Sequence, residues 1–331
     1  MNTDAYDFID ETILPETYKA QNSIRIPDFK VWNGIFAVSK DFAKAAKHFT
    51  VCEMKALAYA LTEVDFRKPM PDAVVLDKKL LANAFGIKTK SGNRTNIIKK
   101  KIAKIATHSE IEYRDNEWNL SGEKTTIIDT VEFSPVEKII ISFTEDGRKL
   151  FGNLQAGNYL IMSTGDIFRM RNINSAILYE YFRYMSFNTA EVNSIGIGIK
   201  RFKTLFSMPQ DGPGSYMRKK GGFDRSNFEK KVLEPICDDL KKCQMIKLTL
   251  DGGNYLKERD TSGMRVKGYK FQWSIEMKKE KWNFPEEKSE LTEASGKETE
   301  LSEGSVGDPE EIKEFSGEEI EDKEDENDYF I

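Results

Sequence analysis

Apolar residues recur along the first part of the chain at helical spacing. Thr50 and Glu53 form a capping-box pattern, and the apolar residues that follow lie three or four positions apart, which predicts a core helix. A short apolar run follows over 73–76. Asp77 is then placed to cap a short helix, and Gly86 is placed to end it, because glycine accepts the left-handed backbone common after a helix.

Two further elements are predicted directly after this short helix. Isoleucines recur on one face of residues 93–107 while lysines and asparagines occupy the other, which predicts an amphipathic helix. Residues 110–120, with Asn116 at the turn, have the pattern of a β-hairpin. The predicted order is therefore helix, short helix, helix and hairpin.

The same helical order returns later in the chain. Apolar residues over 177–185 predict a core helix, and those over 202–206 predict a short helix that stops before Pro209. A third helix is predicted to begin at Ser226, because Ser226 and Glu229 form a second capping-box pattern. Pro235 is expected to kink this helix, since proline removes a backbone donor and crowds the preceding turn.

A two-stranded ribbon is predicted after the third helix. Residues 245–250 have the composition of a strand, and residues 266–276 alternate between large apolar and polar side chains, which is typical of a half-buried strand. Residues 251–265 between them are predicted to form a polar loop. The helix and ribbon order of the first half is thereby repeated.

This repetition predicts an α+β protein with two tandem winged-helix domains. We place the first domain at 31–160 and the second at 165–280, with the strand-like residues 138–143 in the segment that joins them. Residues 1–30 are expected to be irregular. Residues 284–331 are expected to form a disordered acidic tail, because they contain too few large apolar residues to form a core.

Charge is distributed unevenly along the chain. Residues 284–331 contain 19 acidic residues and 4 lysines, a net charge of −15, whereas the other 283 residues carry a net charge of +10. A basic body with an acidic tail is the balance expected of a protein that binds a polyanion. The tail is expected either to compete with nucleic acid for the basic body or to serve solubility or docking.

The sequence offers no support for an enzyme or a cofactor site. The three cysteines form neither an even set nor a close pair, and the two histidines, His48 and His108, lie too far apart for a paired-histidine metal site. The phosphate-binding pattern GxxxxGK[ST] does not occur. No run is long and apolar enough to span a membrane, so we expect a cytoplasmic protein with no membrane partner.

The third helix of the second copy carries the strongest candidate site for DNA. Asn227, Lys230, Lys231 and Glu234 share its outer face, where asparagine suits adenine, and lysine suits guanine or phosphate. Solvation alone would explain such a face on an isolated helix, but a doubled winged-helix plan in a basic body favours DNA. Flanking basic candidates are Arg218, Lys219, Lys220, Arg225, Arg265 and Lys267.

The third helix of the first copy carries a denser but less varied basic set. Lysines outnumber residues that read base edges, so we interpret this set as phosphate contacts, with plain solvation as an equal alternative. Its members are Lys90, Arg94, Asn96, Lys99 and Lys100. The aromatic residues Trp118 and Trp273 lie at core or strand spacing and are expected to pack rather than to stack on bases.

Several segments of the second half resemble the second domain of theta-type plasmid replication initiators, which are tandem winged-helix Rep proteins that bind iterons. These segments are residues 174–184, 202–209, 227–236 and 263–271. The phrase FEKKVLEPI and the basic wing after it are fairly specific to that family. The likeness spans 165–276, whereas residues 28–165 match in layout more than in wording.

The resemblance implies binding to direct repeats at a plasmid origin, opening of adjacent duplex, and recruitment of a host initiator and helicase. It also implies a homodimer, formed through the first domain, in equilibrium with an initiating monomer. By matched position, Asn227, Lys230 and Lys231 would contact bases. The acidic tail departs from the compact form of the family.

Two rival functions share much of this pattern. A transcriptional regulator with tandem winged helices would bind an operator without opening the duplex. A DNA-nicking enzyme would require a metal ion and would leave broken strands.

Overall fold

A computed structural model of the protein describes most of residues 34–276. The described ranges are 34–88, 91–134, 137–155, 157–186, 192–209, 212–218, 222–250, 254–263 and 265–276. The described residues all belong to one compact unit. The expected irregular N-terminal segment and the expected acidic tail both lie outside the described residues.

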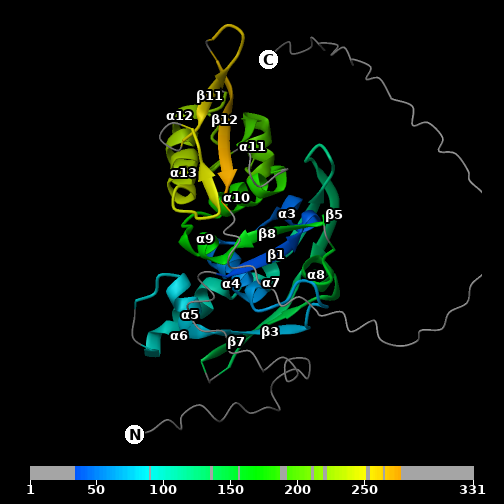
Figure 1. Cartoon of the computed structure of the whole chain (residues 1–331). Coiled ribbons are helices and arrows are strands. Elements are labelled where there is room, and N and C mark those ends of the chain that lie inside the picture. Colours follow the sequence, from blue (N-terminus) through cyan, green and yellow to red (C-terminus); the bar gives the residue numbers. More distant parts are fainter. Residues whose placement is uncertain are drawn as a thin grey trace, which may run out of the picture. The chain divides into compact units, whose positions relative to one another are not determined.

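The first copy combines short helices with three small sheets (Figure 1). Its helices are α3 (Lys40–Lys44), α4 (Val51–Thr62), α5 (Lys78–Ala84), α6 (Ser91–Ile102), α7 (Ile105–His108), α8 (Glu145–Phe151) and α9 (Thr164–Arg169). Its strands are β1 (Ile35–Ser39), β2 (Ala46–Lys47), β3 (Ala73–Asp77), β4 (Glu110–Arg114), β5 (Leu120–Thr126), β6 (Ile128–Phe133), β7 (Lys138–Phe143) and β8 (Tyr159–Ser163). The sheets have the strand orders β1-β8, β2-β4-β5 and β3-β7-β6.

The expected caps of the first copy are confirmed. The Thr50 hydroxyl accepts a hydrogen bond from the Glu53 amide, and the Glu53 carboxylate accepts one from the Thr50 amide, which completes the capping box of α4. Asp77 caps α5, and Gly86 follows that helix with a φ of 69°. The helix expected over 93–107 is instead two helices, α6 and α7, separated at residues 103–104.

The second copy consists of a core helix, a helix-turn-helix pair and a four-stranded sheet. Its helices are α10 (Ile173–Met185), α11 (Ile199–Leu205), α12 (Arg225–Phe228) and α13 (Glu234–Leu240), with a π-helical segment, Glu229–Leu233, between the last two. Its strands are β9 (Asn193–Gly198), β10 (Ile246–Leu248), β11 (Leu256–Arg259) and β12 (Val266–Ile275). The strand order is β10-β12-β11, and β9 also pairs with β12.

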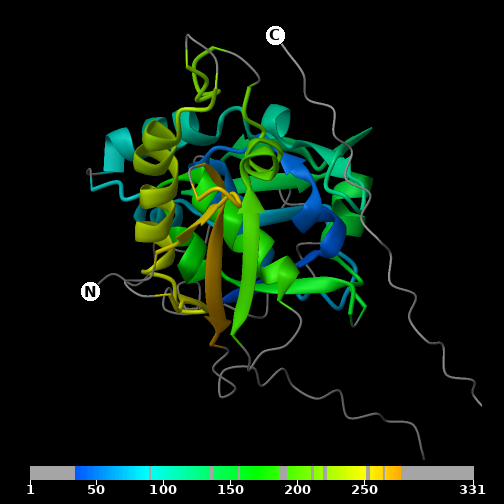
Figure 2. The same cartoon turned by 90° about the horizontal axis from the view of Figure 1, so that it is seen from above.

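Strand β9 was not expected from the sequence. It pairs with β12 from Gly198 opposite Gly268 to Asn193 opposite Trp273, and Figure 2 shows the two strands side by side. The backbones approach so closely at Gly268 that a Cβ there would lie 2.7 Å from the Ile197 carbonyl oxygen. In the first copy the equivalent strand, β3, pairs with β7 instead of joining the β4–β5 hairpin.

Two local expectations for the second copy were wrong. The third helix begins at Arg225 with Asp224 as its N-cap, so Ser226 and Glu229 do not form a capping box. The expected polar loop over 251–265 contains strand β11, whose side chains are largely exposed. Both errors have one cause, because a partner outside the local pattern determines each structure. Asp224 caps the helix in place of Ser226, and β12 pairs with β11.

The third helix bulges before Pro235 rather than simply kinking. The Glu234 amide donates to the Glu229 carbonyl, five residues earlier, within the π-helical segment. Pro235 has no N–H to continue the α-helical bonding, and a π-helical turn accommodates that loss without ending the helix. Val232 and Leu233, within this segment, are both buried.

Aromatic side chains fill the core of the second copy. The rings of Phe182 and Trp273 stack with their centroids 4.3 Å apart, and Phe228 packs edge-on against Phe202 at 5.5 Å. Trp273 is 1% exposed and Trp118 is 6% exposed. The expectation that both tryptophans pack in the protein is confirmed.

The tip of the β4–β5 hairpin packs against the second copy. Trp118 lies edge-on to the rings of Tyr181 and Tyr184, at centroid distances of 4.7 Å and 5.2 Å. Arg114 donates to the Thr204 carbonyl oxygen at 2.7 Å, and Arg201 donates to the Glu117 carbonyl oxygen at 2.6 Å. The tip of the first wing is therefore held by contacts within the protein.

A buried ion pair joins β2 to α10. Lys47 Nζ lies 2.7 Å from Glu180 Oε2, and the two side chains are only 3% and 1% exposed. Lys47 also donates to the carbonyl oxygens of Ala43 and Ala45. Burial lowers the pKa of Lys47 and raises that of Glu180, and their mutual attraction opposes both shifts.

Candidate nucleic-acid interface

The third helix of the second copy presents a polar face to solvent. Phe228, Val232 and Ile236 are buried on the inner side of this helix, so the residues on its opposite side face solvent. Four predicted side chains are exposed together on the outer side: Asn227, Lys230, Lys231 and Glu234. The structure therefore brings the predicted base-contacting residues onto one accessible helix face.

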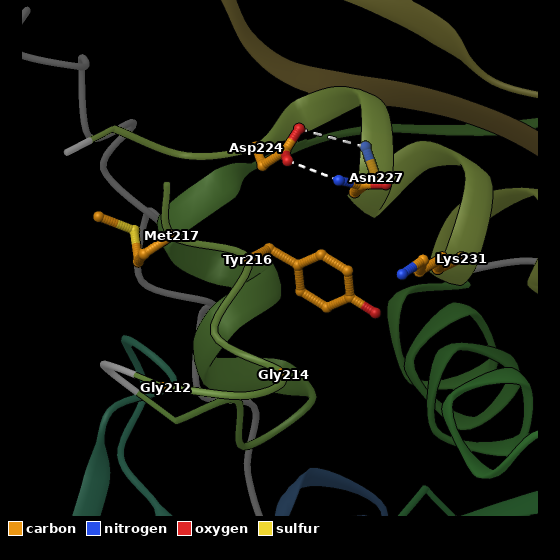
Figure 3. Close-up of a pocket in the computed structure, with 7 residues that line it drawn as sticks. All are labelled: Gly212, Gly214, Tyr216, Met217, Asp224, Asn227 and Lys231. Carbon is orange, nitrogen blue, oxygen red and sulfur yellow. Dashed lines mark hydrogen bonds between the residues drawn. The ribbon is translucent and has the colours of Figure 1, made fainter. Parts of the chain in front are cut away.

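Asp224 holds both the start of this helix and the side chain of Asn227. The Asn227 amide nitrogen Nδ2 donates to Asp224 Oδ2 at 2.6 Å, and the Asn227 backbone N–H donates to Oδ1 at 3.4 Å (Figure 3). The hydrogen bond from the Asn227 side chain is the main cause of a lowered pKa at Asp224. Asp224 therefore accepts both bonds as a carboxylate at neutral pH.

A pocket of about 260 Å³ lies between this helix and the loop that precedes it. In Figure 3, the Tyr216 ring and the Lys231 ammonium group point into the pocket, while Gly212 and Gly214 form its opposite wall. The ring of Tyr216 packs on Phe228, with centroids 5.6 Å apart. The loop is thereby fixed against the third helix at its exposed end.

Glu229 connects the third helix to the wing formed by β11 and β12. Lys257 on β11 donates to Glu229 Oε2 at 2.7 Å, and the Tyr269 hydroxyl on β12 donates to Oε1 at 2.9 Å. Tyr269 is buried, and burial is the main cause of its raised pKa. The helix and the wing therefore present their basic side chains as one unit.

The remaining predicted residues of the second copy differ in their environments. Arg225 donates through Nε to the Val266 carbonyl oxygen at 3.0 Å, so it supports the wing. Arg265 and Lys267 are exposed on the wing. Arg218 Nη2 lies 3.7 Å from Asp224 Oδ1. Lys219 and Lys220 lie outside the described residues.

The third helix of the first copy also has an exposed basic side. Ile98 and Ile102 are buried, whereas Asn96, Lys99 and Lys100 are exposed. The Lys99 ammonium lies over the ring of Phe133, 5.3 Å from its centroid. Arg94 is half-buried, and Lys90 lies outside the described residues.

No group of three or more His, Cys, Asp or Glu residues that could hold a metal ion occurs among the described residues. No helix among them is long and apolar enough to cross a membrane. Lysine, asparagine and arginine side chains beside an exposed helix offer hydrogen bonds and positive charge, which suit phosphate and base edges.

Two units of helix, short helix, helix and hairpin define a tandem winged-helix protein. Residues 35–183 match the family model described as the initiator replication protein WH1 domain. This match confirms the resemblance to replication initiator proteins that the sequence indicated.

A solved structure described as the Pi initiator protein in complex with iteron DNA is similar to this chain. The TM-score is 0.56 at 15% identity, over 74% of this chain and 98% of that chain. A likeness at this identity shows the fold, and the winged-helix prediction is confirmed. Domains 2 and 3 of RctB match at a TM-score of 0.36 and 12% identity, over 69% of this chain and 82% of that chain. No curated protein matches the chain significantly.

Sequence reasoning identified the exposed face of the third helix but missed two residues that organise it. Asp224 precedes Ser226, whose capping pattern was the stronger local signal. Glu229 was assigned to that cap, although its carboxylate binds Lys257 and Tyr269. The alternating pattern of β12 placed Tyr269 on the buried face of that strand. A buried tyrosine hydroxyl requires a hydrogen-bond acceptor, and this requirement was the signal that could have identified Glu229.

Proposed function

We propose that this protein binds iterons in double-stranded DNA at a plasmid origin and starts replication without catalysing a covalent step. The observation that carries the proposal is the exposed set of Asn227, Lys230 and Lys231 on the third helix of a winged-helix unit. The family model matched by residues 35–183 supports the same role, and the similar Pi initiator protein was solved with iteron DNA. We further propose that bound protein opens adjacent duplex, recruits a host initiator and helicase, and exchanges between homodimer and monomer.

The two copies would share the duplex unequally. The second copy offers asparagine and lysines for base edges, with a wing held beside them by Glu229. The first copy offers mainly lysines, which suit phosphates. Its hairpin packs on the second copy through Trp118, so its third helix would make the contact. Two helices in successive major grooves would lie about one turn, or about 10 base pairs, apart.

One experiment tests this function against its rivals. Full-length protein is incubated with the origin of its own plasmid, and protected bases, unpaired bases and strand breaks are mapped on the same DNA. We expect protection of about 20 base pairs per protomer, with unpaired bases nearby and intact strands. Protection without unpaired bases would favour a transcriptional regulator. Metal-dependent nicks would favour a nicking enzyme.

Alanine at Lys230 or Lys231 is expected to weaken iteron binding by about 1–3 kcal/mol and random-duplex binding much less. Both residues are exposed on the helix face that we propose to enter the major groove. The measurement is the dissociation constant on both duplexes at one salt concentration. Lys149→Ala is the matched control, because Lys149 is exposed on α8 and pairs with Glu145. Equal losses on both duplexes would assign the residue to a phosphate.

Alanine at Lys99 or Lys100 is expected to weaken binding to iteron and random duplexes alike. Each lost phosphate contact lowers the slope of log affinity against log salt by about one unit. Titrations at four salt concentrations measure that slope. A slope unchanged from that of the wild-type protein would mean that the basic side of α6 is only solvated.

A further inference from the structure

Asp224 is an acidic residue beside the positive face that we propose to bind DNA. Its side chain is 24% exposed, at the first turn of the third helix. A carboxylate here opposes the approach of phosphates, so its presence at this position calls for a role beyond charge. Capping alone does not require the charge, because serine and asparagine cap helices about as well as aspartate.

We propose that Asp224 is a positioning residue that fixes the carboxamide of Asn227 in the orientation that reads adenine. This proposal rests on the proposed function and names the base recognised at that site. The 2.6 Å bond from Asn227 Nδ2 to Asp224 Oδ2 identifies which end of the carboxamide is nitrogen. One N–H of Nδ2 is engaged with Asp224, which leaves the other N–H and the carbonyl Oδ1 for a ligand.

The free pair of groups matches the major-groove edge of adenine. Adenine accepts at N7 and donates from its N6 amino group, and a single carboxamide satisfies both with one N–H and one carbonyl oxygen. An unrestrained asparagine rotates through a broad, nearly two-fold torsion, so it presents donor and acceptor in either order. The bond to Asp224 removes the reversed order before DNA arrives, which reduces the ordering cost of binding.

The surroundings support this arrangement. The Asn227 backbone N–H donates to the second carboxylate oxygen, so both oxygens of Asp224 hold the same residue. Arg218 Nη2 lies 3.7 Å from Oδ1 and partly offsets the negative charge of Asp224. Asn227 itself is exposed, with Lys231 one turn further along the same face. The carboxamide is therefore held on one side and accessible on the other.

The test uses iteron duplexes in which 7-deazaadenine replaces one adenine at a time across the region protected by the second copy. This base lacks the N7 acceptor and keeps the N6 amino group. We expect one position at which the replacement weakens wild-type binding about tenfold. At that position Asn227→Ala and Asp224→Asn should each bind both duplexes within about twofold. Asp224→Asn keeps one oxygen to cap the helix but replaces the oxygen that accepts from Nδ2 by a donor.

Two controls separate positioning from folding and from charge. Asp224→Ser keeps a capping hydroxyl, and it should lose the same discrimination while its thermal unfolding midpoint shows a folded protein. Asp238→Asn removes an exposed acid from α13 and should keep the tenfold ratio. A uniform gain in affinity from a lost negative charge does not change that ratio.

The outcomes distinguish the proposal from the function on which it rests. A wild-type ratio retained in Asp224→Asn or Asp224→Ser would overturn the positioning role, as would a ratio retained in Asn227→Ala. The absence of any sensitive adenine in a wild-type protein that still prefers iteron DNA would overturn it too. Wild-type binding to iterons no tighter than to random duplex would refute the proposed function itself.

Discussion

Alanine in place of Glu180 is expected to lower the free energy of unfolding by about 3–5 kcal/mol. Glu180 and Lys47 are both buried, with their charged groups 2.7 Å apart. Removal of the carboxylate leaves the Lys47 ammonium buried without its counter-ion, although the carbonyl oxygens of Ala43 and Ala45 and the ring of Phe42 still contact it. Urea denaturation of the full-length wild-type and variant proteins measures the difference.

Two comparisons isolate the buried charge as the cause. The double variant Lys47→Met, Glu180→Met replaces both charges with apolar side chains of similar length, and it should recover most of the loss. Glu145→Ala breaks an exposed pair with Lys149 and should change the free energy of unfolding by less than about 0.5 kcal/mol. A loss below about 1 kcal/mol in Glu180→Ala would contradict the expectation.

Trp118→Ala is expected to lower the free energy of unfolding by about 3–5 kcal/mol. The Trp118 ring is 6% exposed and packs edge-on against Tyr181 and Tyr184, with Arg114 6.0 Å from the ring centroid. Its removal leaves a cavity between the hairpin and α10. The measurement is again denaturation in urea, followed by tyrosine and tryptophan fluorescence and by circular dichroism.

The control for this variant lies on the same hairpin. Leu120 is 50% exposed, so Leu120→Ala should change the free energy of unfolding by less than about 0.5 kcal/mol. Equal, small effects of the two substitutions would mean that the hairpin does not hold the second copy. We also expect Trp118→Ala to bind iterons more weakly, because the two third helices would lose their fixed spacing.

The sequence predicted helices α4, α5, α10 and α11 because their signals are local, but it did not predict α3, α8 or α9. The Thr50 cap, the Asp77 cap and the stop at Gly86 depend on residues within a few positions of one another. The alternation over 266–276 likewise reports burial of one face of a strand, and β12 forms there. Such signals give the order of elements, and the order was sufficient to identify the winged-helix plan.

Strand pairing was harder to predict from the sequence, because the paired strands lie far apart along the chain. β9 contains two glycines, which are depleted in strands, and it becomes a strand by pairing with β12 about 75 residues later. β11 is largely exposed, so its residues carry a polar pattern that is typical of loops. The pairing of β1 with β8 across the first copy depends on the same kind of distant contact.

The candidate site was predictable in its face but not in its internal bonds. Burial of Phe228 and Val232 follows from apolar spacing, and this places Asn227, Lys230 and Lys231 outside. The bonds of Asp224 and Glu229 depend on the exact start of the helix and on the position of the wing. The spacing of apolar residues in one helix determines neither the residue at which the helix starts nor the position of the wing.

The bridge from Glu229 to Lys257 and Tyr269 limits how this protein could be re-engineered. A designer who transplants only residues 225–234 from a relative with another target would leave the wing without the carboxylate that anchors it, unless the donor helix carries one too. The smallest transferable cassette is therefore the helix together with β11 and β12, three segments separated in the sequence but joined by one side chain.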